Sequence, residues 1–382
     1  MKSSDNSNER NLIQIMKLRK IILITSVLAC MLSASACKNS EPLKSSSVTG
    51  ETVQQVTEKV TETQAETQAT EAAESVSTVQ NPLTGEYGYN EAAVNKRPVA
   101  IMINNISQSL PQYGIGSADY MYEIVVEGGI TRMMAVFADY TSVPDICSIR
   151  SCRYYFPIIA YGLDAIYCHW GMDHTIAEET LANLGIDRFD GDDSRYYNSL
   201  FFNDQERLEI YDREHTGYLK GSVLADTIAN AGYRTDITNP KNSFVFNEGE
   251  QPVVPAGVDC DSFTVNFSQS YFSTFTFDQA SGTYLKQHSG EPHIDEATGE
   301  QLAFTNIFVL ETAVSVRDDY GRMDVALDGG TGYYISNGSA QQISWSKPSD
   351  DSNFIITDNS GNAITVNRGK CYFGITSSFY VE

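Results

Sequence analysis

Positive charge is scarce in this chain of 382 residues, which has 26 lysines and arginines against 49 aspartates and glutamates. The formal net charge of −23 argues against a nucleic-acid partner, because a phosphate backbone needs clustered positive charge. The same imbalance disfavours broad adhesion to anionic lipid. Any site for an anion must therefore come from a few basic side chains that gather in one place.

Sequence motifs of well-known catalytic and metal sites are also missing. The chain has neither the Gly-x-Ser-x-Gly turn of serine hydrolases nor a glycine-rich nucleotide loop. The run Asp190-Gly-Asp-Asp lacks the ligand spacing of a calcium loop. No cysteine pair or ladder of cysteines and histidines is spaced as in a zinc site. We therefore expect no cofactor and no metal.

The seven cysteines form no disulfide framework. Five of them follow the amino-terminal region, and their odd number and irregular spacing predict buried free thiols, although disulfides are permitted outside the cytoplasm. These five are Cys147, Cys152, Cys168, Cys260 and Cys371.

The amino-terminal apolar run, residues 21–32, is too short to span a bilayer comfortably. It follows Lys17-Leu-Arg-Lys and ends in Ser-Ala-Ser-Ala before Cys37. This order is typical of a bacterial lipoprotein signal, so we expect cleavage before Cys37 and lipidation of its thiol. A simple signal anchor is the alternative. The predicted location is the cell membrane, with the protein anchored by lipid on the extracytoplasmic face.

Composition divides the chain into four parts. Residues 1–37 hold the signal peptide, and residues 38–80, rich in Ser, Thr, Glu and Gln without aromatics, predict a disordered tether. Strands and helices interleave in residues 81–240, which predicts a mixed α/β domain. Residues 241–382 read as short strands between glycine, asparagine and aspartate turns, which predicts an antiparallel β-rich domain. The expected fold class is therefore α+β.

The first domain contains several elements that can be placed from pattern alone. We expect strands at residues 97–105 and 164–171 and helices at 151–161, 175–184 and 221–231. Pro157 should bend the first of these helices. Thr175 and Glu178 predict a capping box, and Gly185 should end that helix.

The most informative stretch surrounds Gly128 and Gly129, which lie between two apolar runs. A Gly-Gly pair suits a two-residue hairpin turn, so we expect antiparallel strands at residues 122–127 and 130–138. This register places Val125 opposite Arg132. Glu123 and Glu127 then share a face with Arg132, within reach of its side chain.

Three arginines are expected to converge beside this hairpin. Arg150 and Arg153 bracket Ser151, a residue that favours the start of a helix, where free backbone N–H groups attract anions. With Arg132 they would form a positive cluster suited to phosphate or carboxylate.

The alternative is an ordinary structural ion network. Arg132 would then bridge Glu123 and Glu127, while Arg150 pairs with Asp119. We count the carboxylates of Asp119, Glu123 and Glu127 among the candidate site residues in either case.

Histidines supply a second candidate cluster. His169 ends a predicted strand and His174 precedes a predicted helix, a position where α/β folds often place function. As metal ligands they would need a third partner, such as His215 or an aspartate from residues 190–193. Otherwise they are ordinary cap and core histidines.

Several strings together resemble the YerB-type bacterial lipoproteins, a two-domain family of uncharacterised function. The strings begin at Arg97 (Arg-Pro-Val-Ala-Ile-Met-Ile-Asn-Asn), Val126 (Val-Glu-Gly-Gly-Ile-Thr-Arg), Ile149 (Ile-Arg-Ser-Cys-Arg-Tyr-Tyr-Phe), Asp164 (Asp-Ala-Ile-Tyr-Cys-His-Trp-Gly) and Trp345 (Trp-Ser-Lys-Pro). Asn104 stands where the family usually has Asp, and Cys152 where it has Ala. The resemblance implies an envelope location and no particular activity.

Three functions stay open at this point. The first is a lipid-anchored protein that binds an anionic envelope ligand or serves as an envelope scaffold. The second is an enzyme acting on phosphorylated or pyrophosphorylated cell-wall precursors, with Asp119 or Glu123 as base. The order of elements in the first domain is similar to the LytR–CpsA–Psr ligases, in which arginines hold a lipid pyrophosphate. The third is a purely structural module that contacts an envelope protein.

Overall fold

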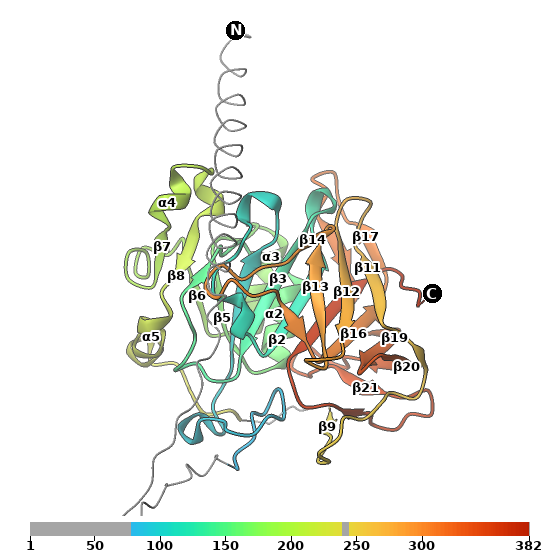
Figure 1. Cartoon of the computed structure of the whole chain (residues 1–382). Coiled ribbons are helices and arrows are strands. Elements are labelled where there is room, and N and C mark those ends of the chain that lie inside the picture. Colours follow the sequence, from blue (N-terminus) through green and yellow to red (C-terminus); the bar gives the residue numbers. More distant parts are fainter. Residues whose placement is uncertain (1–77, 239–243, 382) are drawn as a thin grey trace, which may run out of the picture. The chain divides into compact units, whose positions relative to one another are not determined.

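The computed structural model describes residues 78–238 and 244–381. They belong to one compact unit, Ala72–Glu382 (Figure 1). The predicted lipidation site Cys37 and residues 38–77 of the predicted tether lie outside the described residues.

The first half of the described chain alternates between strands and helices. Its elements are β1 (Val99–Asn104), β2 (Tyr120–Val125), β3 (Thr131–Phe137), β4 (Ile146–Cys147), α2 (Tyr155–Gly162), β5 (Ile166–His169), α3 (Ile176–Leu184), β6 (Arg188–Asp190), β7 (Phe201–Asn203), α4 (Gln205–Leu208), β8 (Gly217–Leu219) and α5 (Leu224–Ala231). Short 3-10 turns are η1 (Glu91–Ala93), η2 (Ser107–Ser109), η3 (Ile115–Ser117), η4 (Glu127–Gly129), η5 (Arg213–His215) and η6 (Gly221–Val223).

The second half consists of strands. These are β9 (Val245–Phe246), β10 (Val258–Asp259), β11 (Ser262–Asn266), β12 (Phe272–Asp278), β13 (Thr283–His288), β14 (Glu291–Pro292), β15 (Ala303–Phe304), β16 (Asn306–Glu311), β17 (Val314–Val316), β18 (Met323–Val325), β19 (Gly329–Ser336), β20 (Ser339–Ser346), β21 (Ile355–Thr357), β22 (Thr365–Val366) and β23 (Cys371–Thr376). The fold is therefore α+β, with a mixed α/β first half and a second half rich in antiparallel strands, as predicted.

One large sheet runs through both halves. Its strand order is β10-β20-β19-β16-β23-β2-β3-β1-β5-β6, with β21 paired to β20. The halves meet where β23 pairs in parallel with β2, from Tyr120 opposite Cys371 to Ile124 opposite Ile375. A second, smaller sheet contains β11, β12, β13, β14 and β15. The predicted domain boundary between residues 240 and 241 stays a prediction, because strands from both sides of it form one continuous sheet.

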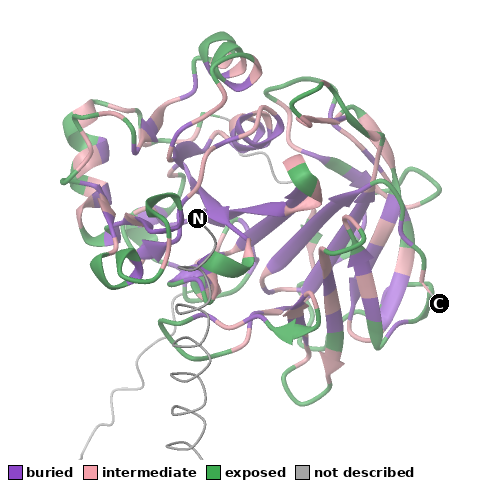
Figure 2. Cartoon of the chain, turned by 90° about the horizontal axis from the view of Figure 1, so that it is seen from above, coloured by how far each residue is buried: buried purple, intermediate pink, exposed green. Residues whose placement is uncertain are grey.

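The central strands are buried on both faces, so they read as continuous apolar runs instead of alternating patterns. Every residue of β1, β2 and β3 is buried, and the strands at the centre of Figure 2 are almost wholly purple. One face, here the helix face, packs against α2 and α3 through residues such as Ile159 and Leu181. The opposite face packs against the smaller sheet and α5 through residues such as Phe275 and Ile228.

The predicted register of the β2–β3 hairpin is wrong by one residue. Ile124 lies opposite Arg132, and Val126 donates its N–H to the Ile130 carbonyl at 2.8 Å. The loop is the three-residue turn η4, in which Gly128 and Gly129 both have positive φ. Because side chains alternate along a strand, this shift turns Glu123 to the face opposite Arg132.

Two helix starts also differ from the predictions. The first helix begins at Tyr155, so Pro157 lies in its first turn, where its missing N–H breaks no hydrogen bond and no bend is required. Asp173 accepts the N–H of Ile176 at the start of α3, and Thr175 makes no cap bond. Gly185 ends α3 in the left-handed conformation, as predicted.

The five cysteines of the described residues are buried and unpaired, which confirms the prediction of free thiols. Across residues 78–238 and 244–381, every helix is too short or too polar to cross a membrane.

Candidate functional site

The arginine cluster, defined as Arg132, Arg150 and Arg153, forms at one end of the central strands. Arg132 is on β3 and faces the helix side of the sheet, next to Asn104 of β1. Arg150 and Arg153 come from the extended segment 148–153 that precedes α2, not from a helix start as predicted. An Arg132 guanidinium nitrogen donates to the Ser151 carbonyl at 2.8 Å, which brings the segment against β3.

Arg132 is the unusual member of the cluster because it is buried and forms no ion pair with any residue that the structure describes. Its residue is 5% exposed, and no hydrogen-bond partner exists for its Nε among the described residues. Its two neighbours are paired: Arg153 Nε lies 2.5 Å from Glu127 Oε1, and Arg150 lies 3.0 Å from Glu214. Burial, then the Arg153 and Arg150 charges, lowers the pKa of Arg132 to about 9.

Two further buried polar atoms, both on β5, lack a hydrogen-bond partner among the described residues. They are the Tyr167 hydroxyl and the His169 Nε2 atom, on rings whose centroids are 5.2 Å apart. His169 Nδ1 donates to the Gly171 carbonyl at 3.0 Å, so Nε2 is left with its lone pair. Burial lowers the pKa of His169 and keeps its ring neutral. Unsatisfied buried groups in native proteins often mark a place where something else binds.

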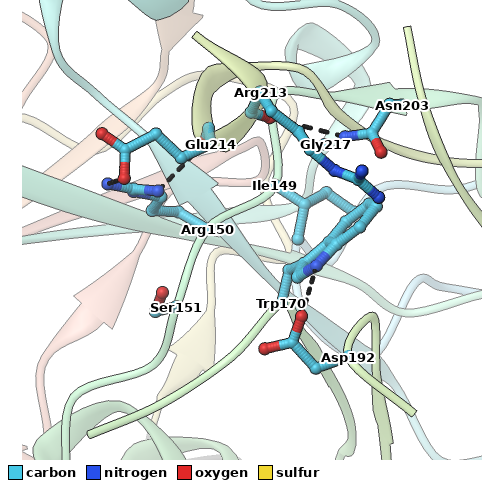
Figure 3. A pocket seen from close by; sticks show the side chains of 9 residues that line it. All are labelled: Ile149, Arg150, Ser151, Trp170, Asp192, Asn203, Arg213, Glu214 and Gly217. Atoms are coloured by element: carbon cyan, nitrogen blue, oxygen red, sulfur yellow. Dashed lines mark hydrogen bonds and ion pairs between the residues drawn. The ribbon is translucent and has the colours of Figure 1, made fainter. Parts of the chain in front are cut away.

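A side pocket of about 320 Å³ adjoins the arginine cluster (Figure 3). Arg150 and Ser151 lie on one side of it, and Trp170 with Asp192 lies on the other. The indole N–H of Trp170 donates to Asp192 Oδ1 at 2.9 Å. The full lining is Ile149, Arg150, Ser151, Trp170, Asp192, Asn203, Arg213, Glu214 and Gly217.

His215 lies next to this pocket, whereas His174 lies away from it. His215 Nδ1 accepts a hydrogen bond from the Asn104 amide at 3.2 Å, and its Nε2 is 3.4 Å from Glu214 Oε1. Burial and the Arg150 charge lower the pKa of His215. His174 precedes α3, has an 82% exposed side chain and contacts Glu178 of that helix. The three histidines therefore do not converge as a metal site would require.

The three candidate carboxylates occupy different places. Glu127 pairs with Arg153. Asp119 accepts hydrogen bonds from the Asn81 amide and the Ala138 N–H, each at 2.7 Å, and lines a separate hollow of about 640 Å³. Burial raises the pKa of Asp119 to about 6. The alternative pairings of Arg132 with Glu123 and of Arg150 with Asp119 are therefore wrong.

Glu123 belongs to a buried polar network on the other face of the large sheet. Its two carboxylate oxygens accept hydrogen bonds from Asn105, Thr131, Ser273 and Tyr372 at 2.8–3.0 Å. Its Oε2 lies 3.2 Å from Lys286 Nζ, and both side chains are buried. Burial alone would raise the pKa of Glu123, but the Lys286 charge and these donors lower it overall.

The network continues from Lys286 toward the side pocket. Lys286 Nζ donates to His293 Nδ1 at 3.0 Å, and His293 Nε2 donates to Gln112 at 2.8 Å. Gln112 in turn donates to the Asn104 carbonyl at 2.9 Å. Since the Asn104 amide contacts His215, a chain of hydrogen bonds joins the smaller sheet to the surroundings of the arginine cluster.

No role is predicted from the sequence for Lys286 or His293. One signal was present: Tyr284, Lys286 and His288 alternate at the inward positions of β13, where apolar residues are usual. A lysine and a histidine at such positions indicate a polar group that the opposite surface must satisfy.

Comparisons with known proteins agree with this architecture. The N-terminal domain of DUF3048, a protein family of unknown function, matches residues 83–234, and its C-terminal domain matches residues 263–373. YerB of Bacillus subtilis (strain 168), which is named as a lipoprotein, is 28% identical over 275 residues, or 71% of this chain and 79% of YerB. The crystal structure of the YerB protein from Bacillus subtilis has a TM-score of 0.68 at 24% identity, and the match covers 78% of this chain and 97% of that one.

Proposed function

The chain belongs to the YerB-type family that the two DUF3048 domains define, and we propose that it is a lipid-anchored envelope protein that binds a small anionic ligand. The lipoprotein name of YerB and the signal pattern that ends at Cys37 support the anchor and the extracytoplasmic location. The arginine cluster supports the ligand.

The observation that carries the proposal is the unpaired burial of Arg132. Within residues 78–238 and 244–381, three guanidinium groups face the two carboxylates of Glu127 and Glu214, which leaves one positive charge without a partner. Taking a charge out of water costs several kcal/mol unless an opposite charge offsets it. Ionisable groups with strongly shifted pKa values cluster at functional sites. An anion that contacts Arg132 would supply the missing negative charge.

The chemistry of the cluster favours phosphate or carboxylate as the bound group. A guanidinium group presents its N–H donors in a planar fork that matches two oxygens of an oxyanion. The Tyr167 hydroxyl, which has no partner among the described residues, can add a further donor on the same side of the sheet. Because the rest of the chain is negatively charged, an anion is attracted only where the arginines gather.

The enzyme interpretation has less support. It needs a base beside the bound phosphate, and Asp119 and Glu123 were the candidates. Asp119 lines another hollow, and Glu123 is ionised within the buried polar network on the opposite face. We therefore favour ligand binding over catalysis.

Titration calorimetry of the full-length chain with pyrophosphate tests the proposal. We expect saturable binding that weakens about 10- to 100-fold in Arg150→Ala, because a charge-assisted hydrogen bond contributes roughly 1.5–3 kcal/mol. Arg195→Ala is the matched control, since Arg195 pairs with Asp193 on the exposed surface, away from the cluster. Equal affinities of the parent chain and Arg150→Ala, or no binding to either, would show that the cluster is not an anion site.

A further inference from the structure

The side pocket differs in charge from the arginine cluster that it adjoins. Its lining has two positive side chains, Arg150 and Arg213, and two negative ones, Asp192 and Glu214. A second phosphate placed there would meet the carboxylate of Asp192 as well as the arginines. The pocket therefore suits an uncharged group that forms hydrogen bonds.

Several polar groups of the pocket have unused hydrogen-bonding capacity. Among the described residues the Ser151 hydroxyl makes no hydrogen bond, and Asp192 Oδ2 accepts none. Arg213 donates to the Tyr197 hydroxyl at 3.0 Å, which leaves most of its N–H donors for other partners. A hydroxyl, a carboxylate oxygen and a guanidinium group around one hollow match the alternating donors and acceptors of a polyhydroxyl compound.

The aromatic content of the pocket argues against a nucleobase. Among the described residues that line it, Trp170 is the one aromatic side chain. Gly191 and Gly217 both pack closely on the indole, since an added Cβ at either would come within 2.4 Å or 3.0 Å of its ring atoms. Tyr197 and Phe201 contact the indole in edge-on arrangements. The ring is thus largely used in packing the protein, and little aromatic surface remains for a flat base to stack on.

Size and position specify the ligand further. A volume of about 320 Å³ lies at the lower end of the range for small-molecule sites, roughly 300–1,000 Å³, and fits one ring-sized group. Ser151 connects the two places, because its carbonyl accepts from Arg132 and its side chain lines the pocket. Arg150 belongs to both. A ligand can therefore have its phosphate on the cluster and its neutral part in the pocket.

We infer that the ligand is a sugar joined to a phosphate, with the sugar ring in the side pocket and the phosphate on the arginine cluster. The inference rests on the proposed function for the phosphate and on the pocket for the sugar. Ser151, Asp192 and Arg213 would bind the sugar hydroxyls and set the preference for a sugar phosphate over phosphate alone.

Calorimetric titration of the full-length chain with inorganic phosphate, glucose 1-phosphate and glucose tests this assignment. We expect glucose 1-phosphate to bind at least about tenfold more tightly than phosphate, and glucose to bind weakly or not at all. The methyl diester of glucose 1-phosphate forms a second arm. Tighter binding of the diester would indicate a sugar phosphate carried by a lipid or polymer, and tighter binding of the monoester a free one.

Two conservative variants test whether the side pocket causes the preference for glucose 1-phosphate over phosphate. Ser151→Ala and Asp192→Asn should each reduce the preference for glucose 1-phosphate over phosphate about fivefold. Ser151→Ala should leave the affinity for phosphate itself unchanged, and Asp192→Asn should not lower it, because that variant removes a negative charge beside the cluster. Asn can still accept the Trp170 hydrogen bond, so the pocket should keep its shape. Asp193→Asn, on the same loop and outside the lining, should change neither affinity.

The outcomes separate this inference from the proposed function. If phosphate binds and Arg150→Ala weakens it, but glucose 1-phosphate binds no more tightly than phosphate, the sugar assignment is wrong and the anion site stands. A preference that persists unchanged in both variants also overturns the assignment. If none of the phosphates binds, the proposed function fails and the sugar assignment fails with it.

Discussion

At the scale of single residues, Arg132 determines the functional interpretation. It lies on the buried strand β3. The positive charges of Arg150 and Arg153 repel its own positive charge and help to lower its pKa. The nearby carboxylates, those of Glu214 and Glu127, form ion pairs with Arg150 and Arg153. The described part of the chain therefore contains a buried positive charge that no carboxylate within it pairs with.

The lowered pKa of Arg132 predicts an unusual pH dependence for anion binding. Below a pH of about 9 the guanidinium is charged and attracts the ligand; as the pH rises through about 9 it loses its proton and that attraction. We expect the dissociation constant of sulfate, whose own charge is constant in this range, to increase by up to about tenfold per pH unit above that value. Calorimetry between pH 7.5 and 10.5 measures it.

The Arg150→Ala variant is the control for this dependence. It should bind sulfate more weakly at pH 7.5, and its loss of affinity should begin at a higher pH than in the parent chain, because the Arg150 charge that helps to lower the pKa of Arg132 is gone. An affinity that stays constant up to pH 10.5 in the parent chain would mean that Arg132 does not contact the anion.

The sequence was sufficient to find the arginine cluster but not its partners. Three arginines within 22 positions, on either side of one apolar strand, indicated convergence. Which carboxylate pairs with which arginine depends on loops that return from residues far along the chain, such as Glu214. The importance of Lys286 and His293 was missed because their partners, Glu123 and Gln112, lie more than 160 positions away. No local pattern reports such contacts.

At the scale of elements, the β2–β3 hairpin shows how one residue changes the chemistry of a face. A Gly-Gly pair is compatible with a two-residue or a three-residue loop, and the two choices put Glu123 on opposite faces of the sheet. The observed three-residue loop sends Glu123 toward Thr131 and β13 and leaves Arg132 on the helix face. Local sequence predicted the strands and could not decide between these loops.

The Glu123–Lys286 ion pair is a fully buried contact between the large sheet and the smaller one. Lys286→Met would leave the Glu123 carboxylate buried without its cation. We expect a loss of about 3–5 kcal/mol in the free energy of unfolding, and partial recovery when Glu123→Gln is added. Urea unfolding followed by circular dichroism measures both.

Lys96→Met provides the comparison for this prediction. Lys96 pairs with Asp236 at the surface, so its replacement should leave the free energy of unfolding unchanged within error. If Lys286→Met were as stable as the parent chain, the buried pair would not stabilise the fold.

At the scale of the whole molecule, the described chain is one body in which both halves share a sheet. The fold class was predictable because strand and helix periodicities change near residue 240. The junction between the two halves of the sheet was not predictable, because β23 comes from the carboxyl-terminal end and inserts between β2 and β16. Pairing over about 250 positions leaves no trace in composition or periodicity.

This arrangement places the arginine cluster and its supporting network on parts that cannot move independently. The hydrogen-bond chain from Lys286 through His293 and Gln112 ends at Asn104, which contacts His215 beside the side pocket. Residues of the second half of the chain thereby help to fix the position of residues around the arginine cluster, which lies on the first half. A site with a preformed geometry binds its ligand without a large ordering cost.

The most direct test measures stability and binding together in Arg132→Met. If Arg132 is kept for an anion, the apolar replacement removes an unpaired buried charge, so the ligand-free chain should gain about 1–4 kcal/mol in the free energy of unfolding and lose its affinity for pyrophosphate. Urea unfolding and calorimetry on the same preparation give both values. A variant that is less stable than the parent chain and binds pyrophosphate equally well would show that Arg132 is a structural residue and would contradict the account.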